Sequence, residues 1–201
     1  MTSCEVTFSS KPLKEEQTST DLDLIDAIAD HDERSFDVLY HRYSVPLYNY
    51  ILRLIHRPHV AEEILQEVFL AVWEGAGRFK GRAKVKTWLF RIAHYQAVSW
   101  LRRKREVLTD DGELPDRPVP PRTESQVIAS WQTDTVRTAL DKLSPEHRAV
   151  LELAFFHEMS YAEIAEVLEC PVGTVKSRMS YARRNLTGHL KAQGVEGAHR
   201  S

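Results

Sequence analysis

The sequence SYAEIAEVLECPVGTVKSRMSYARRNL, residues 160–186, decides the fold of the C-terminal part of the chain. Ser160 and Glu163 have the spacing of a capping box, which predicts the start of a short helix. The residues Glu-Cys-Pro-Val-Gly interrupt that helix, and a second amphipathic helix follows. Its predicted buried face consists of Val175, Met179, Ala182 and Leu186. A short helix, a tight turn and a second helix are the pattern of a DNA-binding helix-turn-helix.

The exposed side of the second helix carries the donors that readout of duplex DNA requires. Cationic side chains near its start can reach base edges in the major groove, and those further along can reach phosphates. Glu169 lies in the turn, where a left-handed backbone and a glycine are expected, so we expect it to cost about 1 kcal/mol. A helical hairpin used for packing is the alternative. The predicted DNA contacts are Thr174, Lys176, Ser177, Arg178, Ser180, Tyr181, Arg183 and Arg184.

The net charge of −2 over 201 residues conceals a separation of charge along the chain. From Arg78 to Arg105 there are ten lysines and arginines and no acid, and from Pro171 to Lys191 there are five more, again without an acid. Basic clusters attract polyanions, while an acidic remainder keeps a protein soluble. A solvated helix face explains one such cluster, but two clusters in separate helical units favour a nucleic-acid partner.

Composition argues against a membrane protein, a secreted protein and a protein held together by disulfides or zinc. No apolar stretch approaches the roughly 18–20 residues that cross a bilayer, and the N-terminus lacks the pattern of a secretory signal. Cys4 and Cys170 are far apart and cannot build a disulfide framework or a zinc site alone. We therefore expect a cytosolic protein with reduced thiols. Whether either cysteine senses oxidants stays open, although a buried structural thiol is the expectation for Cys170.

Apolar spacing is helical nearly everywhere, which predicts an all-α fold of two small helical domains. The expected N-terminal helices are one capped by Thr20, one over 33–55 kinked at Pro46, one over 59–74, and one capped by Thr87 and ending at Arg105. In the second part, Thr123 and Gln126 predict a helix through Leu143, and Ser144 predicts one that ends near His157.

Between the two helical parts the chain reads VLTDDGELPDRPVPPRT, residues 107–123, which is rich in proline and acid. This composition indicates a flexible linker. We therefore divide the chain into a disordered tail over 1–19, a helical domain over 20–106, the linker over 107–123, a helix-turn-helix domain over 124–190 and a tail over 191–201.

Residues 78–105 interleave aromatic side chains with positive charge. Aromatic platforms and cations suit unpaired DNA, because every base offers a face and every nucleotide a phosphate. Phe79 lies in a predicted loop between two cations, which packing alone explains poorly. Trp88 and Phe90 are equally compatible with a core role. The candidates for binding single-stranded DNA are Phe79, Lys80, Arg82, Lys84, Lys86, Trp88, Arg91 and Tyr95.

Several segments together resemble a known family, the extracytoplasmic-function (ECF) sigma factors of bacterial RNA polymerase. The resemblance covers about residues 21–190 in the family's order, and individually the motifs are moderately specific. Residues 36–55 (FDVLYHRYSVPLYNYILRLI), 61–74 (AEEILQEVFLAVWE) and 78–105 (RFKGRAKVKTWLFRIAHYQAVSWLRRKR) are similar to the family's first conserved domain. Residues 143–186, which begin LSPEHRAVLELAFFHEMS and continue through the helix-turn-helix, are similar to its C-terminal domain.

The resemblance implies roles for residues by position. The helix over 61–73 would dock on the clamp coiled coil of the polymerase's largest subunit through Glu62, Glu63, Gln66 and Glu67. Ordinary solvation is the alternative explanation for these polar side chains. The segment 79–86 and the next helix would read the minus-ten element, with one base flipped into a pocket lined by Phe79. Where the family commonly has asparagine, this chain has Tyr95, so a different base preference is expected. The helix after Gly173 would read the minus-thirty-five element.

Three classes of function remain to be compared. A sigma factor would bind polymerase core and promoter DNA, duplex and melted, without catalysis, cofactor or small-molecule substrate, and the resemblance adds an anti-sigma partner. A stand-alone helix-turn-helix regulator explains residues 144–190 but leaves the aromatic-basic segment and the acidic helix without a role. An enzyme is disfavoured, because no metal-ligand spacing, phosphate-binding glycine loop or nucleophile motif occurs.

Overall fold

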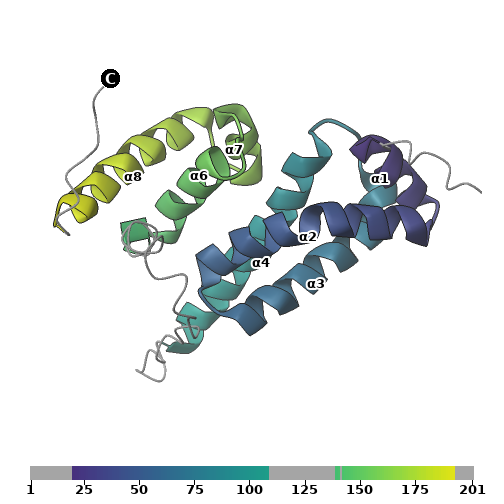
Figure 1. The fold of residues 1–201 in the computed structure, drawn as a ribbon, viewed down its shortest axis with the longest axis horizontal. Helices are drawn as coiled ribbons and strands as arrows, with labels where there is room; N and C mark the ends of the chain where they lie inside the picture. Colours follow the sequence, from purple (N-terminus) through teal and green to yellow (C-terminus); the bar gives the residue numbers. More distant parts are fainter. Residues whose placement is uncertain (1–19, 109–138, 141, 193–201) are drawn as a thin grey trace, which may run out of the picture.

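The computed structural model describes residues 20–108, 139–140 and 142–192. Within these residues the chain is helical and contains no strand, so the prediction of an all-α fold is confirmed. Figure 1 shows two groups of helices, α1 to α4 and α6 to α8, with α6 and α7 beside α2 and α4. Buried apolar side chains of both groups belong to one continuous cluster. The predicted tail over 1–19 lies outside the described residues, as do residues 109–123 of the predicted linker and 193–201 of the predicted C-terminal tail. Residues 107 and 108, assigned to the linker, and residues 191 and 192, assigned to the C-terminal tail, are helical instead.

The first group contains the polar start signals that its sequence predicts. Thr20 accepts a hydrogen bond from the backbone of Asp23, whose carboxylate accepts one from the Thr20 backbone in return, which is the expected cap. The Asp32 side chain caps the next helix by accepting a hydrogen bond from the backbone N–H of Ser35. Pro46 lies inside that helix, which continues past it. The elements are α1 (Asp21–Ala29), α2 (Glu33–Ile55), α3 (Pro58–Gly75), the short 3-10 helix η1 (Ala76–Arg78) and α4 (Val85–Leu108).

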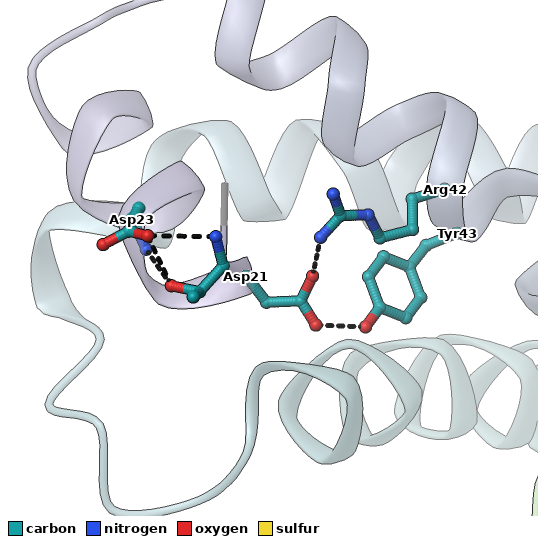
Figure 2. Close-up of polar contacts among 5 residues, drawn as sticks. Asp21, Asp23, Arg42 and Tyr43 are labelled. Atoms are coloured by element: carbon teal, nitrogen blue, oxygen red, sulfur yellow. Dashed lines mark hydrogen bonds and ion pairs between the residues drawn. The ribbon is translucent and has the colours of Figure 1, made fainter. Parts of the chain in front are cut away.

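A polar contact fixes α1 against α2, as Figure 2 shows. The Asp21 carboxylate accepts hydrogen bonds from the guanidinium of Arg42 and from the hydroxyl of Tyr43. Burial, followed by the hydrogen bond to Asp21, raises the pKa of Tyr43 well above its usual range, so this hydroxyl stays a donor. Leu24, Ile25 and Ile28 on α1 then cover the core.

The predicted start of α4 was wrong by three residues, because a cap at Thr87 would place the first helical residue at Trp88. Thr87 was expected to cap this helix, but α4 begins at Val85 and Thr87 is buried inside it, 2% exposed. Val85 is also 2% exposed, so the helix starts where its first apolar side chain enters the core. Burial of this end of α4 outweighs the capping preference of threonine, and only the segment from Phe79 to Lys84 stays non-helical.

In the described part of the chain, the second group contains the helices α6 (Pro145–Phe155), α7 (Tyr161–Val167) and α8 (Val172–Ala192), which surround an apolar core. Ser144 caps α6 as predicted, through the backbone of His147. The predicted helix from Thr123 to Leu143 lies mainly outside the described residues. In α8, Val175, Met179 and Ala182 are buried, whereas Leu186 is partly buried at the edge of the core.

Candidate nucleic-acid and polymerase interfaces

The helix-turn-helix has the geometry that its sequence predicts. Ser160 and Glu163 form a reciprocal capping box at the start of α7. The chain then turns through Glu169, whose φ of 49° is in the left-handed region, before α8 begins. Ile164 and Ala165 are buried where α7 packs on α8. The small side chain of Ala165 permits this close packing, so the turn holds α8 in one orientation.

The left-handed turn predicts a stabilising substitution. Glu169→Gly should raise the free energy of unfolding by about 1 kcal/mol, because glycine has no Cβ to clash in this conformation. Urea denaturation of the full chain measures the change. Glu166→Gly, at an exposed position inside α7, is the matched control and should lower stability by about 1 kcal/mol. A loss of stability at both positions would contradict the proposed cost of Glu169.

The exposed face of α8 is cationic, and neighbouring aromatic rings orient several of its side chains. Tyr181 stacks on His147 of α6 with ring centroids 5.3 Å apart, and Arg184 lies over the Tyr181 ring. Arg183 lies over the exposed ring of Phe155. These contacts reduce the freedom that the side chains would lose on binding. Of the predicted duplex contacts, Lys176, Ser177, Ser180, Tyr181, Arg183 and Arg184 are exposed, and Thr174 and Arg178 are partly buried.

The aromatic-basic segment follows α3 as a short bend that leads into α4. Phe79 is half-buried against Trp88, with ring centroids 4.8 Å apart, and Trp88 lies 3.5 Å from the position where Gly75 would carry a Cβ. Phe79 is therefore partly a packing residue, which the sequence did not suggest. Phe90 is fully buried, so it belongs to the core. The exposed members of the predicted site are Lys80, Arg82, Lys84, Arg91 and Tyr95.

Two predicted DNA-binding lysines contact the second group of helices. Lys86 donates from Nζ to the carbonyl oxygen of His157 at 2.7 Å, and Lys84 forms an ion pair with Glu163 at 2.8 Å. The hydrogen bonds from Lys84 and then from Ser160 lower the pKa of Glu163 to about 2. The structure thus brings the start of α4 to the turn between α6 and α7, whereas Phe79 and Tyr95 have no such contact among the described interactions.

The acidic helix α3 presents one exposed polar face. Its other face is buried in the core through Ile64, Leu65, Val68 and Val72. Leu70, at 58% exposed, adds one apolar side chain to this exposed face. The predicted docking residues Glu62, Glu63, Gln66 and Glu67 are all exposed.

Sequence reasoning missed a set of buried polar residues between the two groups of helices. Arg148 is 5% exposed and Glu152 is 1% exposed, and both lie on α6. They are four residues apart within an otherwise apolar helix face, which is the signal that could have identified them. Arg53 on α2 pairs with Glu152 at 2.5 Å, and His157 is buried against Phe90. These contacts connect residues about half a chain length apart.

Neither a membrane helix nor a metal cluster is found in the described part of the chain. No helix there is long and apolar enough to cross a membrane. No group of at least three His, Cys, Asp or Glu side chains there is placed to hold a metal ion. Cys170 is a free, partly buried thiol in the helix-turn-helix, and Cys4 lies outside the described residues.

Comparison with known proteins identifies both groups of helices. Residues 39–107 match the model of Sigma-70 region 2, and residues 133–186 match the model of Sigma-70, region 4. These two regions define the class: a sigma-70-type initiation factor, which binds RNA polymerase core and recognises promoter DNA. Proteins of this class are non-catalytic transcription initiation factors.

Curated relatives show to which group of sigma factors the chain belongs. The chain is 33% identical over 184 residues to RNA polymerase sigma-H factor of Pseudomonas aeruginosa, covering 85% of this chain and 94% of that protein. It is 30% identical over 178 residues to ECF RNA polymerase sigma factor SigW of Bacillus subtilis, covering 80% and 91% respectively. The chain belongs to the ECF sigma factors of bacterial RNA polymerase.

Solved structures have the same fold. The sigma factor RpoE of Bartonella quintana, in complex with the anti-sigma factor NepR, is 25% identical with a TM-score of 0.68, over 79% of this chain and 98% of that one. CnrH, in complex with the cytosolic domain of CnrY, is 24% identical with a TM-score of 0.66, over 87% and 99%. The latter likeness is one of fold alone.

Proposed function

We propose that promoter recognition and polymerase docking by this sigma factor use three separate surfaces. The observation that supports this division is the placement of the exposed cations of α8 and the aromatic-basic start of α4 on different groups of helices, with the exposed acids on α3. The division into domains over 20–106 and 124–190, joined by a linker over 107–123, belongs to the same proposal.

The first surface is α8, which we assign to the minus-thirty-five element. A helix held by a capped turn can enter the major groove, where arginine and lysine donate to guanine edges. Lys176 and Arg178 lie in the first turns of α8 and are the base-reading candidates. Arg183 and Arg184, further along the helix, are placed for phosphates.

The second surface is the start of α4 with the bend before it, which we assign to the minus-ten element. Melting is driven by capture of unpaired bases, since a flipped base recovers its unstacking cost through stacking and edge contacts. Phe79 and Trp88 offer a ring pair beside Lys80 and Arg82. Tyr95, 64% exposed, adds one hydroxyl and a ring in place of an amide, which should alter base preference.

The third surface is the acidic face of α3, which we assign to the clamp coiled coil of the polymerase's largest subunit. Exposed carboxylates around the exposed Leu70 give an apolar centre with a charged surround, the usual arrangement of a docking site. Such a face implies a basic partner surface, because complementary charge steers association.

The chain itself performs no chemistry in this proposal, needs no cofactor and acts in the cytoplasm, where transcription takes place. We also propose that an anti-sigma factor binds it. The support is that two proteins of the same fold, RpoE of Bartonella quintana and CnrH, were solved as complexes, the first of them with an anti-sigma factor.

Co-elution with polymerase core on size exclusion, followed by run-off transcription, tests the proposed function. A stoichiometric complex that starts transcripts at discrete promoters is expected. A folded chain that binds duplex DNA but never the core would contradict the proposal and would leave a stand-alone regulator.

Substitution of one α8 arginine tests the first surface. Arg178→Ala should weaken holoenzyme binding to a promoter with a minus-thirty-five element about 10- to 100-fold, as expected for loss of a base-reading arginine. Core binding should not change. Arg34→Ala, an exposed arginine at the start of α2, is the matched control and should alter neither affinity. Equal loss of promoter and core binding would show that the residue acts on folding instead.

A further inference from the structure

Each group of helices donates a cationic side chain to a backbone carbonyl of the other. Arg148 of α6 donates from Nη1 to the carbonyl of Arg53 at 2.9 Å, in the last turn of α2. Lys86 of α4 donates to the carbonyl of His157 at 2.7 Å, just after α6 ends. The last carbonyls of a helix lack intrahelical partners and carry partial negative charge, so a cation there is favourable. Each group therefore supplies a cationic side chain that hydrogen-bonds a carbonyl of the other group.

A buried ion pair lies between these two caps. The Glu152 carboxylate is 1% exposed and pairs with Arg53 at 2.5 Å. The same guanidinium lies 3.9 Å from the centroid of the Phe156 ring. A carboxylate removed from water is tolerated when cations pair with it, and it becomes strongly unfavourable when a partner is removed. Glu152 can therefore stay buried against α2 while Arg53 is in place.

An aromatic contact closes the junction. The His157 imidazole lies 4.4 Å from the ring of Phe90 and 6.0 Å from that of Tyr50, measured between centroids. Phe90 and Tyr50 are both fully buried. Part of the cover over these two rings comes from the second group, so separation of the groups would expose apolar surface. The junction thus combines apolar cover with paired charge.

The closed arrangement uses atoms that the minus-ten surface needs. Lys86 is partly buried and its ammonium is directed at the end of α6. Lys84 pairs with Glu163, although its side chain remains 77% exposed, so this second contact contributes little. α7 packs along α4 at the same place. An unpaired strand that takes a phosphate contact from Lys86 must compete with the hydrogen bond to His157.

We propose that the two DNA-binding domains of this sigma factor hold each other closed, so that docking of the α6–α7 turn on the start of α4 competes with melted promoter DNA for Lys86 and Lys84. This inference rests on the proposed assignment of those lysines to the minus-ten element. If only open molecules bind single-stranded DNA, the apparent association constant equals the intrinsic association constant multiplied by the fraction of molecules that are open.

The test uses the full chain without polymerase. Arg53→Ala removes this partner of Glu152. The loss is unfavourable in the closed form, where the carboxylate is buried, and less so in the open form, where water reaches it. The variant should show a larger radius of gyration by small-angle X-ray scattering and about tenfold tighter binding of a fluorescent oligothymidylate. Phe156→Ala should shift both readouts in the same direction, and its half-exposed ring makes it safe for folding. Arg34→Ala is the matched control and should change neither.

Two outcomes would overturn the inference. An unchanged radius of gyration in both folded variants would show that the junction does not hold the domains together. Opening without tighter binding would show that the junction does not compete with DNA. In that case Lys86→Ala, measured in holoenzyme on a pre-melted promoter, separates the causes. Weaker binding there leaves the minus-ten assignment intact, and unchanged binding shows that the assignment itself fails.

Discussion

A chain in which lysine replaces both Glu63 and Gln66 is expected to lose at least about 100-fold in affinity for polymerase core, because like charges would face each other across the docking surface. Both side chains are exposed on α3 beside Glu62 and Glu67, so the substitutions leave the core of the first domain untouched. The face changes from three carboxylates to two carboxylates and two lysines. Competition against the unaltered chain for core, followed by size exclusion, measures the loss.

The control for this prediction is a larger charge reversal at another place. Asp26→Lys combined with Asp30→Lys changes exposed residues at the end of α1, where cations suit the helix dipole. This variant should bind core as the unaltered chain does. A similar loss in both variants would show that overall charge, and not the face of α3, determines binding. Unchanged affinity in the α3 variant would mean that the docking face is wrongly assigned.

Local signals in the sequence predicted most of the helices correctly. Thr20 with Asp23 and Ser160 with Glu163 each combine a capping hydroxyl with an acid three residues later, and both capping boxes form. The range 33–55 agrees with α2 because apolar residues repeat at helical spacing throughout it. Such signals depend on neighbouring residues, so the sequence shows them directly.

Errors arose where packing outweighs a local preference. Thr87 is a good capping residue, but the burial of Val85 starts α4 three residues earlier than a cap at Thr87 would. The packing contact of Phe79 was also missed: cations flank it in the sequence, which made packing alone a poor explanation, and its ring lies against Trp88. In both cases the deciding contact comes from the folded core, which the flanking residues do not reveal.

The junction between the domains could not be predicted from sequence spacing at all. Arg53 and Glu152 are 99 positions apart, with the proline-rich segment between them. The four-residue spacing of Arg148 and Glu152 on an apolar face indicates buried charge, but it does not say which cation or carbonyl in the first domain is the partner. For the DNA-binding lysines, sequence reasoning identified the residue type that DNA needs but not the second contact that Lys86 makes.

Acidification from pH 7 to pH 5 is expected to destabilise the chain by up to about 4 kcal/mol, a large part of the stability of a small protein. Burial, reinforced by Arg178, lowers the pKa of His94 to about 4, and burial with the charges of Lys86 and Arg53 does the same for His157. Unfolded histidine titrates near 6.5, so between about pH 6.5 and 4 the unfolded chain binds more protons. Stability therefore falls as pH decreases through this window, by about 2 kcal/mol per histidine at pH 5.

Urea denaturation of the full chain at pH 7 and pH 5 measures this difference, and two substitutions assign it. His94→Asn keeps a polar partner for the Tyr50 hydroxyl, which lies 2.8 Å from Nδ1 of His94. His157→Leu is tolerated because Nε2 of His157 is buried without a hydrogen-bond partner among the described residues. The double variant should lose most of the pH dependence above pH 5, whereas His59→Asn on the exposed start of α3 should retain it.

The low pKa of Glu163 affects stability only below about pH 4.5, so it does not contribute between pH 7 and pH 5. A double variant as acid-sensitive as the unaltered chain would show that other groups control the transition.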